Sequence, residues 1–425
     1  MSVSSRTPSG TAPERSRLSA AASSSVASRL GPSRAIQTPE SIEERSTPWR
    51  PPLDPLLTLA VLGLAACSLV TLNAATKHLI PGSPRYYVDR QATYLIAGLV
   101  CMVVLSRVDY ARLRHLKYGL YALLLLSILA VFAIGHSAHG AQRAISLPFF
   151  SFQASELGKV FLIIALSSYV VDRARKLGDR ETTVRVMLAA LVPAMLVIAQ
   201  PDLGSGLVYM VIAFTLLFVA GTSWHQLSAL VALIVVSLSF ILLAAPVAGV
   251  HVIKPYQEER LTAFLHPSAN PQKQGYQQEE AKIAIGAGQK TGRGENASQI
   301  PNGFVPESHT DFVFAAVGEQ YGFVGAALVL ALYGLLISRT LRMIVLARDL
   351  FGTLLAAGVA AMLMFQVFVN VGMTIGIMPI TGVTLPLMSY GGSSVITTML
   401  AVGLLQSVYV QARASQAMKG RVLRH

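Results

Sequence analysis

Charged residues are scarce in this sequence of 425 amino acids. Asp, Glu, Lys and Arg make up 13% of it and hydrophobic residues 53%, whereas ordinary soluble domains carry about 25% charged residues. The few charges cluster between apolar runs, each long enough to span the roughly 30 Å hydrocarbon core of a bilayer. The composition excludes an ordinary soluble domain and predicts an all-α, polytopic membrane helix bundle.

Cysteine is nearly absent, and several catalytic motifs are missing. The two cysteines, Cys67 and Cys101, lie inside apolar runs, which argues against a disulfide or a cysteine metal site. There is no Walker motif, no HExxH and no CxxC, so ATP-driven pumping and zinc hydrolysis have no support. The basic residues that produce the net charge of +13 flank the spans, as expected for membrane topology. Their distribution therefore does not indicate nucleic-acid binding.

Apolar run lengths divide the chain into three parts. Residues 1–52 are rich in Ser, Ala, Pro and Arg, which predicts a disordered cytoplasmic tail. Residues 53–412 form the predicted transmembrane domain, and 413–425 a basic cytoplasmic tail. About ten spans are expected, at 54–75, 90–106, 117–136, 154–172, 184–200, 203–220, 226–247, 311–337, 353–378 and 385–411.

Most of the Lys and Arg residues in the short links between these spans lie on one side. With an even number of spans, this distribution predicts that both termini lie in the cytoplasm. The opposite side receives one large connection, residues 248–310, between the seventh and eighth spans. Loops of this length are usually functional, so we expect an ordered, partly membrane-apposed extracytoplasmic loop.

Four stretches on the extracytoplasmic side carry candidate site residues. In QRAISLPFFSFQASELGKV, Arg143 precedes the fourth span, and Glu156 and Lys159 share one helix face inside it. Ionisable groups within a span indicate either a site or a structural ion pair. In AQPDLGSG, Asp202 begins a span, where helix capping is a simpler explanation than direct catalysis.

The third stretch, FVPESHTDF, places four polar residues at the entrance of the eighth span: Glu307, His309, Thr310 and Asp311. Capping suits Asp311 but explains neither His309 nor Glu319 farther along the span. A cluster of acid, imidazole and hydroxyl groups is suited to orienting sugar hydroxyls or holding a divalent cation.

The fourth stretch, GIMPITGVTLPLMSYGGSS, breaks helix geometry between two spans. Irregular backbone at membrane depth is tolerated where it is buried in protein or lines a watery cavity. Ser389, Gly391, Gly392 and Ser393 then open the last span, where they permit close helix packing or phosphate contacts.

The stretches FQASELGKV, QPDLGSG, PESHTDFVFAAVGEQYGFVG and PLMSYGGSS, in this order, resemble the signature stretches of the SEDS family, the FtsW/RodA/SpoVE proteins. The resemblance covers roughly residues 53–412 and looks slightly nearer to RodA-type members. It implies a peptidoglycan glycosyltransferase of the bacterial cytoplasmic membrane. Such enzymes polymerise lipid II on the outer face, with inversion, beside a class B penicillin-binding protein and other elongation or division machinery.

The implied reaction joins a sugar hydroxyl to an anomeric carbon while undecaprenyl diphosphate leaves. It needs a base, a hydrophobic groove for the polyprenyl chain, and positive charge or a divalent cation (Mg²⁺ or Mn²⁺) for the diphosphate. Arg143, Lys159 and Arg293 can supply positive charge, and the spans beside the large loop can supply the groove.

One position departs from the family pattern. Many members carry an aspartate in a stretch like NPxxDPxGxGYQ, but here the text is HPSANPQKQGYQ, with Asn270 at that position. A neutral amide takes no proton near neutral pH. Either Glu280 or Glu259 is the base, or Asn270 only orients the hydroxyl, or the chain is an inactive scaffold. A lipid II flippase is a further alternative, and we favour retained polymerase activity because the other stretches are intact.

Overall fold

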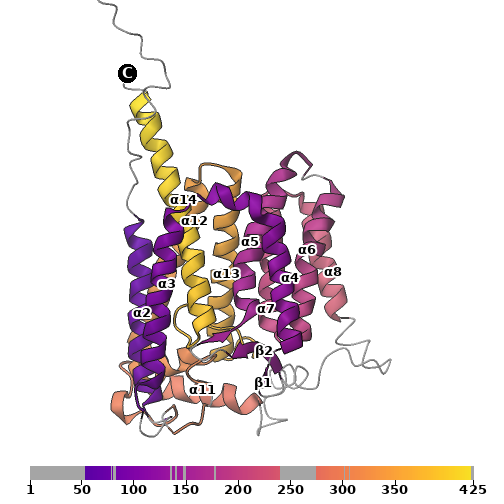
Figure 1. Ribbon diagram of the computed structural model, residues 1–425. Coiled ribbons are helices and arrows are strands. Elements are labelled where there is room, and N and C mark those ends of the chain that lie inside the picture. The colour runs from indigo at the N-terminus through magenta and orange to yellow at the C-terminus, as the bar shows by residue number, and fades with distance from the viewer. Residues whose placement is uncertain are drawn as a thin grey trace, which may run out of the picture. The chain divides into compact units, whose positions relative to one another are not determined.

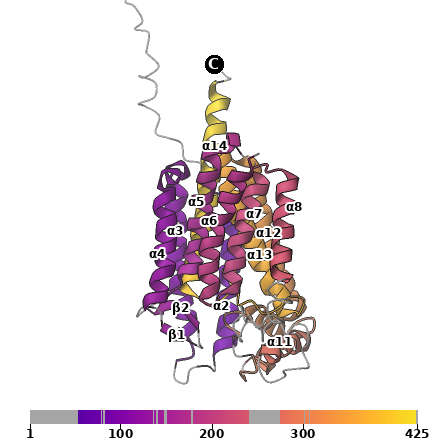
Figure 2. The ribbon, with the colours of Figure 1, turned by 90° about the vertical axis from the view of Figure 1, so that its right-hand side faces the viewer.

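Antiparallel helices make up most of the chain described by the computed structural model (Figures 1 and 2). Ten of them overlap the ten expected spans. The described residues are 53–77, 79, 83–134, 136–138, 141–146, 150–176, 179–239, 274–300, 302–305 and 307–422. The ten helices are α2 (Pro55–Thr76), α3 (Tyr86–Arg107), α4 (Lys117–Ile134), α5 (Ala154–Asp172), α6 (Arg180–Ala199), α7 (Leu203–Val219), α8 (Trp224–Ser239), α12 (Val313–Leu346), α13 (Leu350–Thr374) and α14 (Gly392–Val422).

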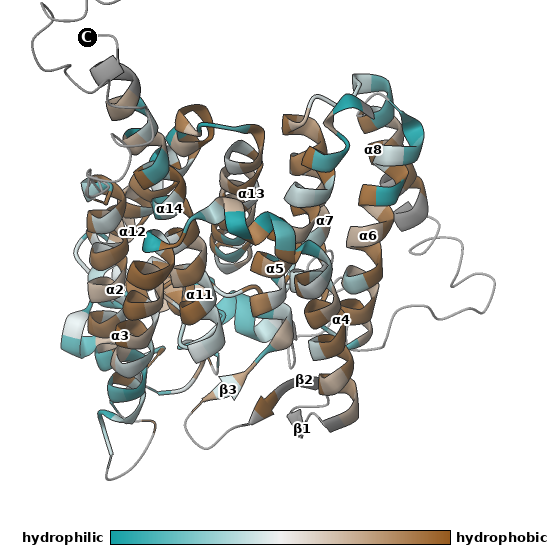
Figure 3. Ribbon diagram, turned by 45° about the horizontal axis from the view of Figure 1, so that its top comes forward, coloured by the Kyte–Doolittle hydropathy of each residue, from teal (hydrophilic) through white to brown (hydrophobic). Residues whose placement is uncertain are grey.

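Within the described residues, eight helices are long and apolar enough to cross a membrane. Helix α7 is apolar but has only 17 residues, and α8 is described over 16 residues. Figure 3 shows hydrophobic residues along outer helices such as α3 and α4. The expected all-α, polytopic membrane fold is confirmed.

Three expected limits are wrong, and one of them is the end of the last helix: α14 continues to Val422 rather than ending at residue 411. The last helix begins at Gly392 rather than at residue 385, because Gly382 and Leu387 on either side of Pro386 adopt φ angles of 72° and 65°. These are left-handed conformations that an α-helix does not contain. Helix α12 continues to Leu346, beyond the expected end at 337.

A small antiparallel sheet interrupts the helical pattern between α4 and α5. Its strands are β1 (His136–Ala138), β2 (Ala141–Ser146) and β3 (Ser151–Phe152), in the order β1-β2-β3. We call the end of the bundle with this sheet and α11 (Gln274–Gly288) the hairpin end. The opposite end, with the 3₁₀ helices η1 (Tyr110–Leu116) and η2 (Ala174–Lys176) and the α12–α13 link, is the basic end (Figure 1).

Helices α5, α13 and α14 form the interior of the bundle. Helix α5 contacts α4, α7, α13 and α14, and α14 packs along α3. The last contact is close: a Cβ atom on Gly403 would lie 2.8 Å from the carbonyl oxygen of Met102. Small residues at such positions permit the close backbone packing that holds membrane helices together.

Helix α12 is kinked at Gly322, where φ is 61° and ψ is −157°. The end of the long connection lies against this kink, and the backbone N–H of Phe323 donates to the carbonyl of Gln289 at 2.9 Å. A Cβ atom on Gly322 would lie 2.3 Å from the backbone nitrogen of Gly292. Only glycine at position 322 allows both the positive φ and this approach.

The carboxylate of Glu319 fixes the same connection to α12. The side chain is fully buried, and its oxygens accept hydrogen bonds from the backbone N–H groups of Ser298 (2.8 Å), Gln299 (2.7 Å) and Ile300 (2.8 Å). Bonds from amides to an ionised acceptor are stronger than neutral ones. This explains the acid inside an apolar span: it orders residues 298–300.

A second buried carboxylate, Asp54, joins three helices at the basic end. It caps α2 by accepting from the N–H of Leu57 at 2.9 Å, and it forms an ion pair with Arg339 of α12. The backbone N–H of Asp54 donates to the side-chain oxygen of Gln406 of α14 at 2.8 Å. The start of the membrane bundle is thus tied to two later helices.

The Glu319 contacts predict a large effect from a small change. Glu319→Gln should lower the free energy of unfolding by about 1–3 kcal/mol. The side-chain NH₂ of glutamine would replace one carboxylate oxygen, so at least one backbone N–H would lose its acceptor and face another donor. Thermal unfolding in detergent measures the effect. The exposed Glu295, replaced by Gln, is the matched control; equal melting temperatures for the two variants would contradict this role of Glu319.

Candidate functional site

All four singled-out stretches are joined by hydrogen bonds at the hairpin end, where α5, α7, α12 and α14 begin (Figure 1). Asp202 connects α7 to the start of α5. The residue is 3% exposed, and one carboxylate oxygen caps α7 by accepting from the N–H of Ser205 at 3.1 Å, as the sequence predicts. The other oxygen accepts from the hydroxyl of Ser155 (3.0 Å) and the side-chain amide of Gln153 (3.2 Å).

Ser393 extends this connection to α14. Its hydroxyl accepts from the backbone N–H of Gln153 at 2.9 Å and donates to the carbonyl of Ser151 at 2.8 Å. At the neighbouring Gly392, a Cβ atom would lie 2.8 Å from the ring of Phe150. The first turn of α14 therefore holds the strand that leads into α5, and Gly392 has a packing role.

The residues just before α14 are held in a defined turn. The hydroxyl of Ser389 accepts from the N–H of Leu385 at 2.8 Å, and the N–H of Tyr390 donates to the carbonyl of His309 at 2.8 Å. A Cβ atom on Gly391 would have open space, with its nearest neighbour 3.9 Å away. The Tyr390 bond links the fourth stretch to the third, at the entrance of α12.

The entrance of α12 presents partly exposed polar groups. The hydroxyl of Thr310 donates to the carboxylate of Glu307 at 2.6 Å, and the side-chain amide of Asn370 donates to the carbonyl of Asp311 at 2.8 Å. The N-cap position of α12 belongs to Phe312 rather than to Asp311. Glu307, Thr310 and Asp311 are partly exposed, so a ligand can reach them.

His309 lies inside this surface, with its ring 5.0 Å from that of Tyr87. Its Nδ1 atom is buried and has no hydrogen-bond partner among the described residues. Burial lowers the pKa of His309 below its usual range, against the opposing effect of the Glu307 carboxylate. The imidazole is therefore neutral near pH 7 and can both donate and accept a hydrogen bond.

Glu156 and Lys159 form an ion pair inside the bundle. The ammonium lies 2.6 Å from the carboxylate, and the two side chains are 2% (Lys159) and 5% (Glu156) exposed. This geometry fits a structural ion pair, which is one of the two explanations that the sequence allows for Glu156 and Lys159. Diphosphate binding by Lys159 stays a prediction, and in this structure the ammonium is directed to Glu156.

The remaining candidates are not part of this network. Asn270 and Glu259 lie outside the described residues, and for Arg143 only the backbone, in β2, is described. Glu280 lies on α11, one turn after Tyr276, whose hydroxyl interacts with the Glu280 carboxylate. Arg293 donates to the carbonyl of Ala287 at 3.1 Å, so it braces its own loop.

Three residues of the network were missed by the sequence reasoning: Gln153, Ser155 and Asn370. The first two lie within FQASELGKV, and Asn370 is an amide inside an otherwise apolar span. An uncharged polar residue within a span is the signal that could have identified Asn370. Its side chain bridges the carbonyls of Asp311 and Val383, at 2.8 and 2.7 Å.

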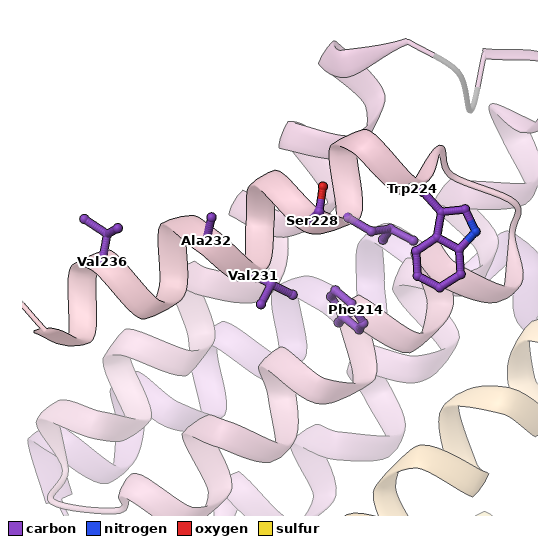
Figure 4. Close-up of a pocket in the computed structure, with 7 residues that line it drawn as sticks. Phe214, Trp224, Ser228, Val231, Ala232 and Val236 are labelled. Carbon is purple, nitrogen blue, oxygen red and sulfur yellow. The ribbon is translucent and has the colours of Figure 1, made fainter.

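Two further features bear on ligands. Among the residues that the structure describes, no group of three or more His, Cys, Asp or Glu side chains could hold a metal ion, so a divalent cation stays a prediction. An apolar groove of about 510 Å³ lies between α7 and α8, and Figure 4 shows Phe214, Val231 and Trp224 along it. An apolar hollow of this size suits a hydrocarbon chain.

The family model and the most similar curated proteins point to the same family. The family model for FtsW/RodA/SpoVE, described as "Cell cycle protein", matches residues 53–414. The chain is 36% identical to a probable peptidoglycan glycosyltransferase FtsW of Thioalkalivibrio sulfidiphilus over 87% of this chain and 93% of the relative. It is 33% identical to the peptidoglycan glycosyltransferase MrdB of Escherichia coli K12 over 85% of this chain and 94% of the relative.

Solved structures agree with these relatives. The chain superimposes with a TM-score of 0.71 and 32% identity on a chain from a peptidoglycan synthase complex that coordinates polymerization and crosslinking, covering 85% of this chain and 98% of that one. For the rod shape determining protein RodA of Thermus thermophilus, the TM-score is 0.60 at 30% identity, covering 85% and 97%. Since both FtsW and RodA-type proteins appear, the preference for RodA-type members stays a prediction.

The Asp202 contacts predict coupling between α5 and α7. Asp202→Asn and Ser155→Ala should each destabilise the chain, and together by less than their sum, with a coupling of at least about 0.5 kcal/mol. Thermal or denaturant unfolding of the two single variants and the double variant measures this. Ser168→Ala, also on α5 but bonded to Ile164 in its own helix, is the control and should add independently to Asp202→Asn.

The buried imidazole predicts a pH dependence of stability. The folded pKa of His309 lies below its unfolded value of about 6.5, so the unfolded chain binds more protons as pH falls below that value. The melting temperature should therefore decrease between pH 7.5 and 5.5, and less steeply in His309→Gln. His225→Gln, which removes an exposed histidine of α8, should keep the wild-type slope; an unchanged slope in His309→Gln would contradict the assignment.

Proposed function

Because the chain belongs to the FtsW/RodA/SpoVE family of cell cycle proteins, we propose that it is a peptidoglycan glycosyltransferase of cell elongation or division. Its substrate is lipid II, which it polymerises at the hairpin end of the bundle. One observation supports this site most strongly. The hydrogen-bond network of Asp202, Gln153 and Ser393 and the Tyr390–His309 bond join stretches that are far apart in the sequence into one surface.

The chemistry of the α12 entrance fits a sugar substrate. Carboxylates at Glu307 and Asp311 can accept hydrogen bonds from sugar hydroxyls, and a neutral His309 can do the same through an unprotonated ring nitrogen. The backbone carbonyls of His309 and Asp311 accept hydrogen bonds from Tyr390 and Asn370, which hold this segment in place. A surface that is rigid before the substrate arrives holds the reacting hydroxyl in place at little entropic cost.

Three groups are candidates for the catalytic base. Glu280, Glu259 or a group that acts with Asn270 would remove the proton from the attacking hydroxyl. Positive charge for the departing diphosphate would come from Arg143 or Arg293 rather than from Lys159, whose ammonium already pairs with Glu156. The apolar groove beside α8 begins at Trp224, at the basic end, and continues to Val236 toward the hairpin end, so it would hold the far part of the long polyprenyl chain.

Charge distribution supports an orientation for the bundle. The basic end carries the arginine-rich links around η1, η2 and the α12–α13 connection, so it would face the cytoplasm together with both termini. The hairpin end would then face outward, where lipid II and a class B penicillin-binding protein meet. The similarity to a chain of a peptidoglycan synthase complex supports such a partner.

Two alternatives make different demands on the structure. A flippase needs polar groups at several depths along one path, whereas Asp202, Glu156 and Lys159 lie within the first turns of α7 and α5 at the hairpin end. An inactive scaffold needs no working base, which Asn270 would explain. A polymerase that acts at the hairpin end needs accessible polar groups there, and the partly exposed residues at the α12 entrance meet this need. Neither a flippase nor a scaffold requires these exposed groups.

Replacement of Asp311 tests the proposal. Asp311→Ala should reduce glycan polymer from lipid II by about tenfold or more, as loss of a group that touches substrate does, while the amount of folded protein falls little. Gel separation of glycan strands made by the purified chain measures this. Asp109→Ala, at the basic end, is the control; equal losses of polymer and folded protein in Asp311→Ala would contradict a role in binding.

The departure at position 270 has its own test in the same assay. Asn270→Asp restores the carboxylate of the family pattern and should increase polymer formation if wild type polymerises through a weaker base. Glycan ladders from wild type identify a polymerase, and translocation of lipid II in vesicles without ladders identifies a flippase. With neither, wild type is a scaffold and the proposal is wrong.

A further inference from the structure

A cavity of about 560 Å³ lies at the basic end, and the candidate site does not involve it. Its walls come from η1, the start of α4, the end of α5 and the start of α13. The charged groups that line it are Arg114, Lys117, Asp172 and Asp349, with His115 beside them. The volume falls within the range of small-ligand sites, so a bound group would fit without rearrangement.

Around Asp172, two cationic side chains face a single carboxylate. This carboxylate accepts hydrogen bonds from the guanidinium of Arg114, at 3.1 and 2.6 Å, and it also pairs with the ammonium of Lys117. Two cations thus share one anion and keep unused N–H donors. Their side chains are 43% (Arg114) and 20% (Lys117) exposed, so a second anion can reach both.

The other carboxylate of the cavity, Asp349, is already engaged. One oxygen accepts from the N–H of Gly352 at 2.8 Å, which caps α13, and from the hydroxyl of Tyr110 at 3.1 Å. The other oxygen lies 3.5 Å from the guanidinium of Arg348. Asp349 therefore holds its own helix and does not compensate the cations beside Asp172.

The neighbouring residues place this cavity at the membrane surface. Lys117 is the first residue of α4, where an apolar span begins. Leu116 and Tyr118, on either side of it, are 53% and 72% exposed, and the ammonium of Lys117 lies 4.8 Å from the centre of the Tyr118 ring. An exposed leucine and tyrosine flanking a cation are typical of the interface where lipid phosphates lie.

We propose that this cavity binds the phosphate headgroup of an anionic phospholipid from the surrounding leaflet. The phosphodiester accepts hydrogen bonds from Arg114 and Lys117 and shares them with Asp172, while the acyl chains run past Leu116 and Tyr118 into the bilayer. Basic pockets between membrane helices recognise such headgroups. A zwitterionic lipid fits less well, because it adds no net negative charge to balance the second cation.

A lipid titration of the purified full-length chain tests this. Phosphatidylglycerol is added to the protein in a neutral detergent, and the melting temperature is followed, with phosphatidylcholine and inorganic phosphate as separate titrations. Phosphatidylglycerol should raise the melting temperature saturably, and the other two should not. Equal shifts with phosphatidylcholine, or with inorganic phosphate, would overturn the proposal.

Variants locate the effect in the cavity. The double variant Arg114→Gln, Lys117→Gln should need at least about tenfold more phosphatidylglycerol for a half-maximal shift. The control Arg112→Gln, Arg342→Gln removes two exposed cations of the same end from outside the cavity and should behave as wild type. The same weakening in both double variants would mean general attraction to a basic surface and would overturn the site.

A third variant separates binding from structural support. Asp172→Asn removes the anion that competes with the phosphate, so it should lower the phosphatidylglycerol concentration for a half-maximal shift. If Arg114 and Lys117 served only to brace Asp172, this variant would lose stability without gaining affinity. That result would overturn the proposal even where the cation variants fold poorly.

Discussion

A carboxylate inside an apolar helix bundle needs hydrogen-bond donors from its own chain, and this constraint shapes the whole molecule. Asp202 finds donors on α5 and α7, Glu319 finds three backbone amides of the long connection, and Asp54 finds Arg339 of α12. Each carboxylate thereby ties segments that are distant in the sequence. The few buried charges of this apolar chain therefore hold its helices together.

This dual use explains why the hairpin end can act as a rigid surface. Behind it lie fully committed groups, such as Asp202 and the Glu156–Lys159 pair, which are nearly inaccessible. In front lie Glu307, Thr310 and Asp311, which are partly exposed. The family relationship indicates the reaction. Within the proposed site, the buried polar groups hold the surface in place, and the partly exposed groups are the ones that a sugar substrate would contact.

Much of the fold follows from the sequence, because apolar run length is a local property. All ten expected spans overlap helices, and the role of Asp202 as a cap follows from its place at a helix start. The partners of Glu319 could not be predicted, because they are the backbone N–H groups of residues 298–300. Almost every residue type has a backbone N–H group, so the sequence does not indicate which ones bind the carboxylate. The late start of α14 depends on left-handed backbone at Leu387, which its residue type disfavours. The positions around Asn270 lie outside the described residues, so the base stays a prediction.

The central claim is that lipid II binds beside the α12 entrance, and photo-crosslinking tests it most directly. A photoreactive benzoylphenylalanine replaces Tyr87, whose ring lies 5.0 Å from that of His309, or Leu341, an exposed residue of α12 toward the basic end. With labelled lipid II and light, the account predicts a covalent adduct at position 87 and little at 341. An adduct at position 341 with none at 87, from folded protein, would contradict it.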